Sequence, residues 1–238
     1  MTRIGRYYQS SLGKKAVLAV TGGIMAAFLL LHMAGNLKIF AGQTSIDEYA
    51  TQLRMLGAHF VGKDGVLWIT RVILIVAVLL HIITVILLVR KNRLARPTRY
   101  THRPATQSSL ASRLMVVSGT MIFLFIVIHI LQFTLGVIDP TPILIGADGV
   151  PEVYANLHAA FSVWWIALFY VVMMGLICLH LNHGIWSGFQ TLGMNNPDRN
   201  ALFRLIATVI AGAIFIGFSA VPVMIFLGAM PAPTGETP

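Results

Sequence analysis

The stretch that decides the fold is residues 16–37, AVLAVTGGIMAAFLLLHMAGNL, which contains no Asp, Glu, Lys or Arg. About 20 predominantly apolar residues in an α-helix, rising about 1.5 Å each, cross the roughly 30 Å hydrocarbon core of a bilayer. Four further long apolar stretches follow, at residues 66–89, 114–136, 153–187 and 205–228. The sequence therefore predicts an all-α integral membrane protein with five transmembrane helices. The fourth is long enough for its first turns to lie outside the bilayer.

Composition excludes a water-soluble domain. The chain has 238 residues, of which 57% are hydrophobic and 11% are charged, whereas soluble domains carry about 25% charged residues. Lys and Arg outnumber Asp and Glu by 17 to 8, but they cluster between the apolar stretches, so we expect no nucleic-acid partner. The single cysteine, Cys178, lies inside an apolar stretch and excludes a disulfide framework. The first apolar stretch is too long for a cleavable signal peptide.

The basic residues also predict the orientation. Three lie in the loop after the first helix, and thirteen lie on the opposite side of the membrane: Arg3, Arg6, Lys14, Lys15, Arg90, Lys91, Arg93, Arg96, Arg99, Arg103, Arg113, Arg199 and Arg204. Because Lys and Arg accumulate in cytoplasmic loops, we expect a cytoplasmic N-terminus and an outside C-terminus in a multi-pass protein of the cell membrane.

Outside the helices, the sequence predicts little independent structure. Residues 45–57, SIDEYATQLRMLG, have the pattern of a short amphipathic helix lying at the outer interface. Residues 1–230 form a single transmembrane domain in this interpretation, and residues 231–238 a disordered tail. Arg96, Arg99 and Arg103 are candidates for contact with a soluble subunit, although they would serve equally well to set the topology.

Five of the eight histidines lie inside the apolar stretches, at least one on each of the first four helices: His32, His81, His129, His180 and His183. The other three, His59, His102 and His158, fall in loops or at a helix mouth and are expected at the solvated surface. An ionisable residue at membrane depth is costly and indicates function. The alternative is a set of neutral histidines that hydrogen-bond neighbouring helices.

Depth sorts these histidines into two layers. His32 and His129 lie roughly 25 and 24 Å from the cytoplasmic edge, and His81 roughly 13 Å, at about 1.5 Å per residue. His180 belongs to the cytoplasmic half with His81. Two layers of two histidines are what two b-type haems with paired imidazole ligands need, whereas zinc would need three or four ligands at one level. Side chains expected to support the ligands or haem propionates are Ser118, Thr120, Thr84, Asn36, Gln132 and Asn182.

Two segments resemble a known family. SSLGKKAVLAVTGGIMAAFLLLHMAGNL, with His32 before Gly35 and Asn36, is similar to the first helix of the single-chain, dihaem cytochrome b subunits of succinate dehydrogenases and fumarate reductases (succinate:quinone oxidoreductases). LHLNHGIWSGFQTLG, with His180 four residues before Gly184, resembles the end of their fourth helix. His81 and His129 occupy the corresponding places in the second and third helices.

The resemblance implies a membrane-anchor electron-transfer subunit with no succinate chemistry of its own. It implies two haem b groups, one on His32 and His129 (outer) and one on His81 and His180 (cytoplasmic side), with His183 near a propionate. Its partners would be a flavoprotein and an iron–sulfur subunit on the cytoplasmic side. Some members carry a glutamate two residues before the fourth-helix ligand; here that residue is Cys178, so we do not expect that proton path.

A quinone, menaquinone or ubiquinone, would be the membrane substrate. Two mouths can hold it: a cytoplasmic one near Tyr7, Ser10, Ser11, Lys14 and Trp186, and an outer one near Asp47, Glu48, Tyr49, Gln52 and His59. We favour the outer mouth because a second haem is needed only if electrons cross most of the bilayer. The alternatives for the whole chain are the cytochrome b of a hydrogenase or formate dehydrogenase and a haem-free transporter.

Overall fold

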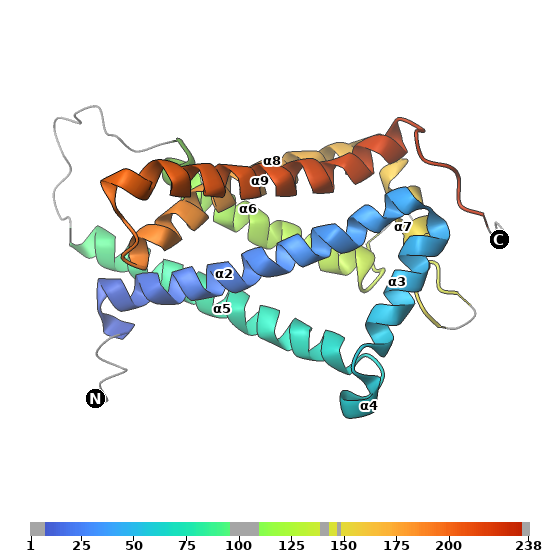
Figure 1. The fold of residues 1–238 in the computed structure, drawn as a ribbon, viewed down its shortest axis with the longest axis horizontal. Helices are drawn as coiled ribbons and strands as arrows, with labels where there is room; N and C mark the ends of the chain where they lie inside the picture. The colour runs from blue at the N-terminus through green and yellow to red at the C-terminus, as the bar shows by residue number, and fades with distance from the viewer. Residues whose placement is uncertain (1–7, 96–109, 139–142, 147–148, 235–238) are drawn as a thin grey trace.

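The structure is a computed structural model that describes residues 8–95, 110–138, 143–146 and 149–234 (Figure 1). Tyr7, Arg96, Arg99, Arg103 and His102 lie outside the described residues. The described chain is helical apart from turns and one isolated bridge between Ile145 and Pro151.

Five of the described helices are long and apolar enough to cross a membrane: α2 (Ser11–Asn36), α5 (Gly65–Leu94), α6 (Leu110–Phe133), α8 (Trp164–Thr191) and α9 (Pro197–Phe226). The prediction of an all-helical chain with five such helices is therefore confirmed. α2 and α9 begin five and eight residues before their apolar stretches. The Ser10 side chain accepts a hydrogen bond from the Gly13 amide at the start of α2, and the Asn196 side chain accepts one from the Asp198 amide at the start of α9. Both bonds satisfy amides that the start of a helix leaves unpaired.

The prediction of one continuous fourth helix over residues 153–187 is wrong. The segment is divided into α7 (Val153–Phe161) and α8, with Ser162 and Val163 between them. The Ser162 hydroxyl donates to the His158 carbonyl at 2.7 Å, and Val163 takes an extended conformation with φ −87° and ψ 113°. A residue with an extended backbone cannot continue the helix, so α7 forms a separate short segment at the end of the bundle.

The loop after α2 is also helical. It contains η1 (Leu37–Ala41), α3 (Gln43–Met55) and α4 (Ala58–Val61), so a helix is present where the amphipathic pattern predicted one. α3 packs against α7 at the end of the molecule where the chain finishes (Figure 1). The beginning of the expected tail makes contacts here: Tyr154 donates to the Pro231 carbonyl at 2.7 Å, and the Thr234 amide donates to Gln43 at 2.8 Å.

The long helices pack as an unequal bundle. α8 packs along α9, α6 and α2, while α5 packs mainly along α2. Figure 1 shows α2 running between α9 and α5. The buried apolar core follows α7, α8 and α9, and the outward faces of all five helices expose large aliphatic side chains, as lipid contact allows. α2 and α6 thus both pack against α8, while α5 joins the bundle mainly through α2.

Gly217 on α9 makes close packing of α2 possible. A Cβ atom at this position would lie 2.8 Å from Cγ of Met33, which is closer than packed carbon atoms approach. We expect Gly217→Ala to destabilise the folded protein by about 1–3 kcal/mol through overpacking. Unfolding of detergent-solubilised protein in SDS, followed by tryptophan fluorescence, would measure the change.

Gly212 provides the control on the same helix. A Cβ atom there meets nothing within 4 Å, and alanine is the better helix former by about 1 kcal/mol. Gly212→Ala should therefore leave stability unchanged or raise it. Equal losses in both variants would contradict the close contact between Gly217 and Met33.

Candidate functional site

His32 on α2 and His129 on α6 meet in the interior of the bundle. Their ring centroids are 6.0 Å apart and their planes lie at 81°. Phe28 stacks on His32 at 5.3 Å, and Phe218 of α9 lies 5.5 Å away. Because α2 and α6 each pack along α8, the two rings approach each other across the bundle and are surrounded by aromatic side chains.

This separation matches two imidazoles on opposite sides of one metal ion. An imidazole nitrogen binds a transition metal at about 2.0 Å, and the ring centroid lies about 1 Å further out, so two opposed ligands place their centroids about 6 Å apart. Each ring can rotate about its metal–nitrogen bond, so an angle of 81° between the planes is compatible with this arrangement.

Tyr170 on α8 fixes the orientation of the His129 ring. The Tyr170 hydroxyl donates to Oε1 of Gln132 at 2.9 Å and lies 3.4 Å from Nδ1 of His129. A phenol has one hydrogen to donate, and Gln132 receives it. The His129 Nδ1–H is therefore the donor to Tyr170, which leaves Nε2 with its lone pair free to bind a metal.

His81 on α5 is held in the same way by α2. Its Nδ1 atom lies 2.9 Å from the Thr21 hydroxyl, which itself donates to the Val17 carbonyl at 2.8 Å. The next residue, Gly22, faces the ring: a Cβ atom there would lie 3.5 Å from Cε1 of His81. The hydroxyl thus accepts from Nδ1–H, and the glycine leaves room for the ring.

The arrangement is repeated for His180 on α8. Its Nδ1 atom lies 3.1 Å from the Ser118 hydroxyl of α6, which donates to the Met115 carbonyl at 3.3 Å. A Cβ atom at the next residue, Gly119, would lie 3.3 Å from Cε1 of His180. His81 and His180 are therefore each held by a hydroxyl residue that is followed by glycine.

The four histidines fit an iron porphyrin better than a compact metal site. Each is half-buried, and no hydrogen bond among the described residues uses Nε2 of any of them. In the part of the chain that the structure describes, no group of three or more His, Cys, Asp or Glu is placed to hold a metal ion. Imidazoles with free Nε2 atoms, packed against glycines and phenylalanines, are suited to bind the iron of a flat macrocycle.

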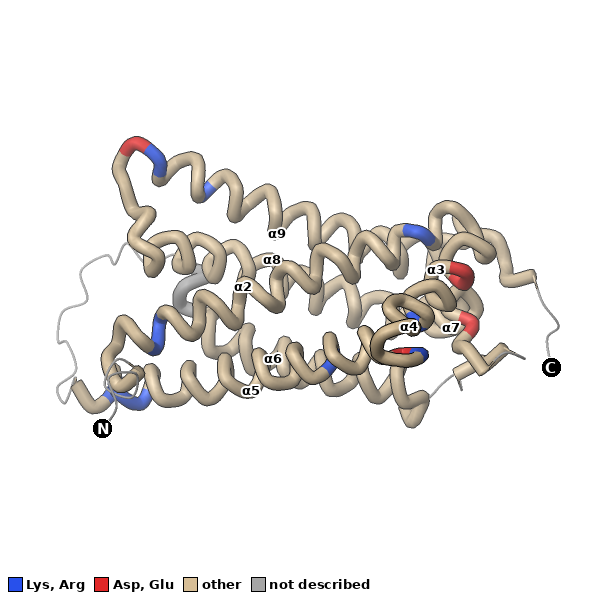
Figure 2. The backbone as a smooth tube through the Cα atoms, turned by 60° about the horizontal axis from the view of Figure 1, so that its bottom comes forward, with Lys and Arg blue, Asp and Glu red and all other residues tan. Residues whose placement is uncertain are grey.

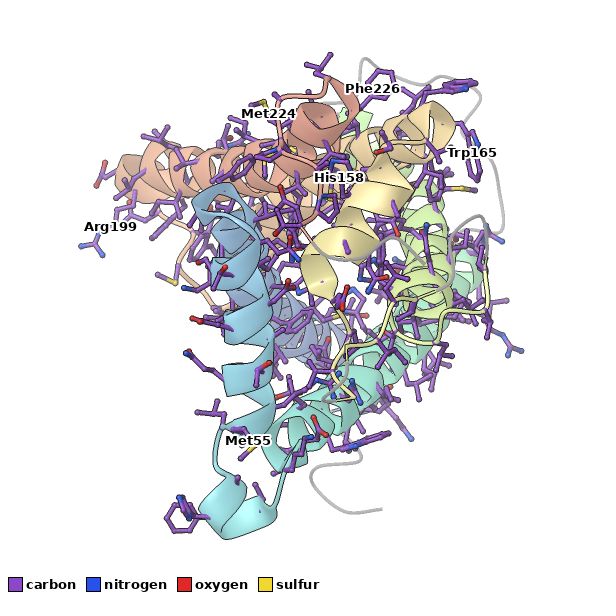
Figure 3. All side chains as sticks on the ribbon, turned by 90° about the vertical axis from the view of Figure 1, so that its right-hand side faces the viewer. Met55, His158, Trp165, Arg199, Met224 and Phe226 are labelled. Carbon is purple, nitrogen blue, oxygen red and sulfur yellow. The ribbon has the colours of Figure 1, made fainter. Side chains whose placement is uncertain are left out.

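The remaining predicted histidines lie elsewhere. His183 is half-buried, one turn beyond His180 on α8. His59 on α4 is exposed, as expected. His158 was expected at the solvated surface, but it is half-buried on α7, where its ring stacks on Tyr154 with centroids 6.3 Å apart. Figure 3 looks onto this end of the bundle, with His158 on α7 well away from Met55 at the far end of α3.

The structure separates the residues of the predicted outer quinone site. Glu48 and Gln52 line a surface hollow of about 360 Å³ between η1 and α3, together with Lys38, Ala41, Thr44, Ser45 and Tyr49. Asp47 does not line it and instead accepts a hydrogen bond from the Tyr154 amide at 3.0 Å, in the first turn of α7. His59 lies on a different helix. A quinone site here stays a prediction, carried by Glu48 and Gln52.

Two of the residues that hold the histidines had not been predicted from the sequence. Ser118 was among the expected partners, but Thr21 and Tyr170 were not. Thr84 bonds the Tyr8 hydroxyl at 3.2 Å, and Thr120 bonds its own helix at the Val116 carbonyl. The available signal was the hydroxyl–glycine pair, which occurs at residues 21–22 and again at 118–119.

Comparison with protein-family models, curated protein sequences and solved structures found no match for this chain.

Proposed function

We propose that this chain is the membrane-anchor subunit of a succinate:quinone oxidoreductase and carries electrons between an iron–sulfur subunit and a membrane quinone. The observation that carries the proposal is the approach of His32 and His129, whose ring centroids lie 6.0 Å apart. His81 and His180 add to it, because each is held at Nδ1 by a hydroxyl of a neighbouring helix. His32 and His129 would bind one haem b and His81 and His180 a second. A bound haem supplies an iron that takes up and releases one electron at a time.

The residues of the chain would control how that iron behaves. Thr21, Ser118 and Tyr170 each accept a hydrogen bond from a histidine Nδ1–H, which orients the ring and raises the basicity of Nε2. The aromatic and aliphatic side chains around the rings keep the site dry, and burial is one of the properties that set a haem potential. The chain would thus bind and tune the haems and perform no chemistry on succinate.

The partners follow from the sequence. The flavoprotein and iron–sulfur subunits are proposed because the segments around His32 and His180 resemble those of dihaem anchor subunits. We place the partners, the N-terminus and the basic loops on the cytoplasmic side of the cell membrane, from the distribution of Lys and Arg. The quinone would bind at the outer mouth near Glu48 and Gln52.

A haem assay tests the proposal directly. The full chain purified from membranes should give two haem b per polypeptide in a pyridine haemochrome assay. Its reduced-minus-oxidised spectrum should have the sharp bands of six-coordinate, low-spin haem. Flavin and iron–sulfur clusters should co-purify with it under mild extraction. A preparation that is folded and haem-free would contradict the proposal, and so would one with a single haem.

A further inference from the structure

Two lysine ammonium groups converge at one end of α2 and α5. Lys14 is 7% exposed, and its Nζ atom donates to the carbonyl oxygens of Tyr8 at 3.0 Å and Gln9 at 3.1 Å. Lys91 of α5 donates to the same Gln9 oxygen at 3.1 Å. The two positive charges therefore lie within two hydrogen-bond lengths of each other, on a neutral acceptor.

Among the residues that the structure describes, no carboxylate forms an ion pair with either lysine. The ion pair that the described residues contain joins Arg54 to Asp64, near the start of α5 at the opposite end of that helix. Residues 1–46 and 65–138 contain no Asp or Glu at all. Figure 2 shows the carboxylates gathered around α3, α4 and α7, with Asp198 at the start of α9 as the exception among those drawn.

An unpaired cation is unfavourable at this position for two reasons. Burying a charge is costly unless it is paired. Lys14 also lies in the first turn of α2, where the helix dipole favours anions and opposes cations. The backbone carbonyls use two of the three hydrogens of the Lys14 ammonium. An anion that reached this point would relieve the repulsion between Lys14 and Lys91 and take the remaining donor.

The lysine site lies on the same side of the helices as His81. Lys14 precedes Thr21 by seven residues, or about two turns, so both lie on one face of α2. Thr84 follows His81 by three residues on α5, is fully buried, and bonds the Tyr8 hydroxyl at 3.2 Å. The Lys14 ammonium stands 5.1 Å from the centre of the Tyr8 ring. Lys14, Tyr8 and Thr84 thus form a polar cluster between the His81 ring and the end of the bundle.

We propose that Lys14 and Lys91, with the Tyr8 hydroxyl, bind the propionate carboxylates of the haem held by His81 and His180. This inference rests on the proposed function, since it needs a haem at that level. Propionate arms carry two carboxylates at one edge of the macrocycle, and two turns of helix is about the reach from the iron to those carboxylates. Ionised carboxylates and ammonium groups form strong charge-assisted hydrogen bonds, which supply the missing counter-charge.

Lys14→Gln tests the site, with Lys15→Gln as its matched control because Lys15 is the next residue and is exposed. The readout is a spectroelectrochemical titration of both haems in the purified full chain. The inner haem is identified as the one absent from His180→Ala. Loss of the Lys14 cation should disfavour the reduced haem roughly tenfold, a drop of about 59 mV for a one-electron couple. Lys15→Gln and the charge-preserving Lys14→Arg should remain near the parent value.

Each outcome decides the question. A lower potential of the inner haem alone, or loss of that haem alone with Lys14→Arg intact, supports the site. Unchanged potentials overturn it, as does a shift confined to the outer haem. A loss of co-purifying phospholipid with no change in potential would assign the lysines to a lipid phosphate and also overturn it. If Lys14→Gln does not accumulate, Lys91→Gln at the exposed partner decides, with the same direction expected. A haem-free parent protein would defeat the proposed function itself.

Discussion

Replacing His180 by alanine is expected to reduce the haem content from two per chain to one. The imidazole is held by the Ser118 hydroxyl at 3.1 Å and packs against Gly119, so its Nε2 atom has a fixed direction and the variant leaves no substitute there. The outer pair, His32 and His129, is separate and should keep its haem. A pyridine haemochrome assay and the loss of one wave in a redox titration would measure the change.

His183→Ala is the control for this substitution. His183 lies three residues further along α8, so the two side chains diverge by roughly 60° around the helix axis, and none of the ring-holding hydrogen bonds found for His180 involves it. We expect this variant to retain two haems, with at most a change in potential if His183 contacts a propionate. Retention of both haems in His180→Ala and loss of one in His183→Ala would show that the ligand is misassigned.

The sequence predicted that His32 and His129 lie at one level, and their rings meet in the structure. An α-helix has a fixed rise per residue, so counting from the basic residues at the helix ends gives depth. Rotation about the helix axis is different, because it depends on how neighbouring helices pack. The partners Thr21 and Tyr170 are decided by that rotation, and for this reason the sequence did not reveal them.

The end of the bundle that carries α3 and α7 was harder to predict for a related reason. Asp47 has the sequence context of an interfacial proton exchanger, yet its carboxylate accepts from the Tyr154 amide, in a segment more than 100 residues later. The break at Ser162 is equally invisible to hydropathy, since the flanking residues are apolar on both sides. Contacts between distant segments and local capping decided both features, whereas the number of long helices depended on apolar length alone.

The repeated hydroxyl–glycine pair predicts that a large side chain at either glycine will remove one haem. Thr21–Gly22 on α2 and Ser118–Gly119 on α6 each combine an acceptor for Nδ1–H with an open space beside the ring. The hydroxyl sets the tautomer, and the glycine lets the imidazole and a macrocycle approach the backbone. A large side chain at either glycine would occupy the space of the ring itself.

Gly119→Leu is therefore expected to eliminate the inner haem while the outer haem remains. A Cβ atom at Gly119 would already lie 3.3 Å from Cε1 of His180, so the further atoms of leucine must displace the ring from its ligand position. Gly22→Leu should act in the same way through His81, where the first contact is 3.5 Å. Haem content and the number of redox waves in the purified chain would measure both variants.

Gly23→Leu is the matched control, because Gly23 is the next residue on α2 and a Cβ atom there meets nothing within 4 Å. It should keep two haems. The alanine variants give a finer test, since Gly119→Ala places its methyl group closer to a histidine than Gly22→Ala does and should disturb the inner haem more. Equal haem loss in Gly22→Leu and Gly23→Leu would indicate general damage to α2. Full haem content in Gly119→Leu would mean that the His180 ring does not use this space when the haem is bound.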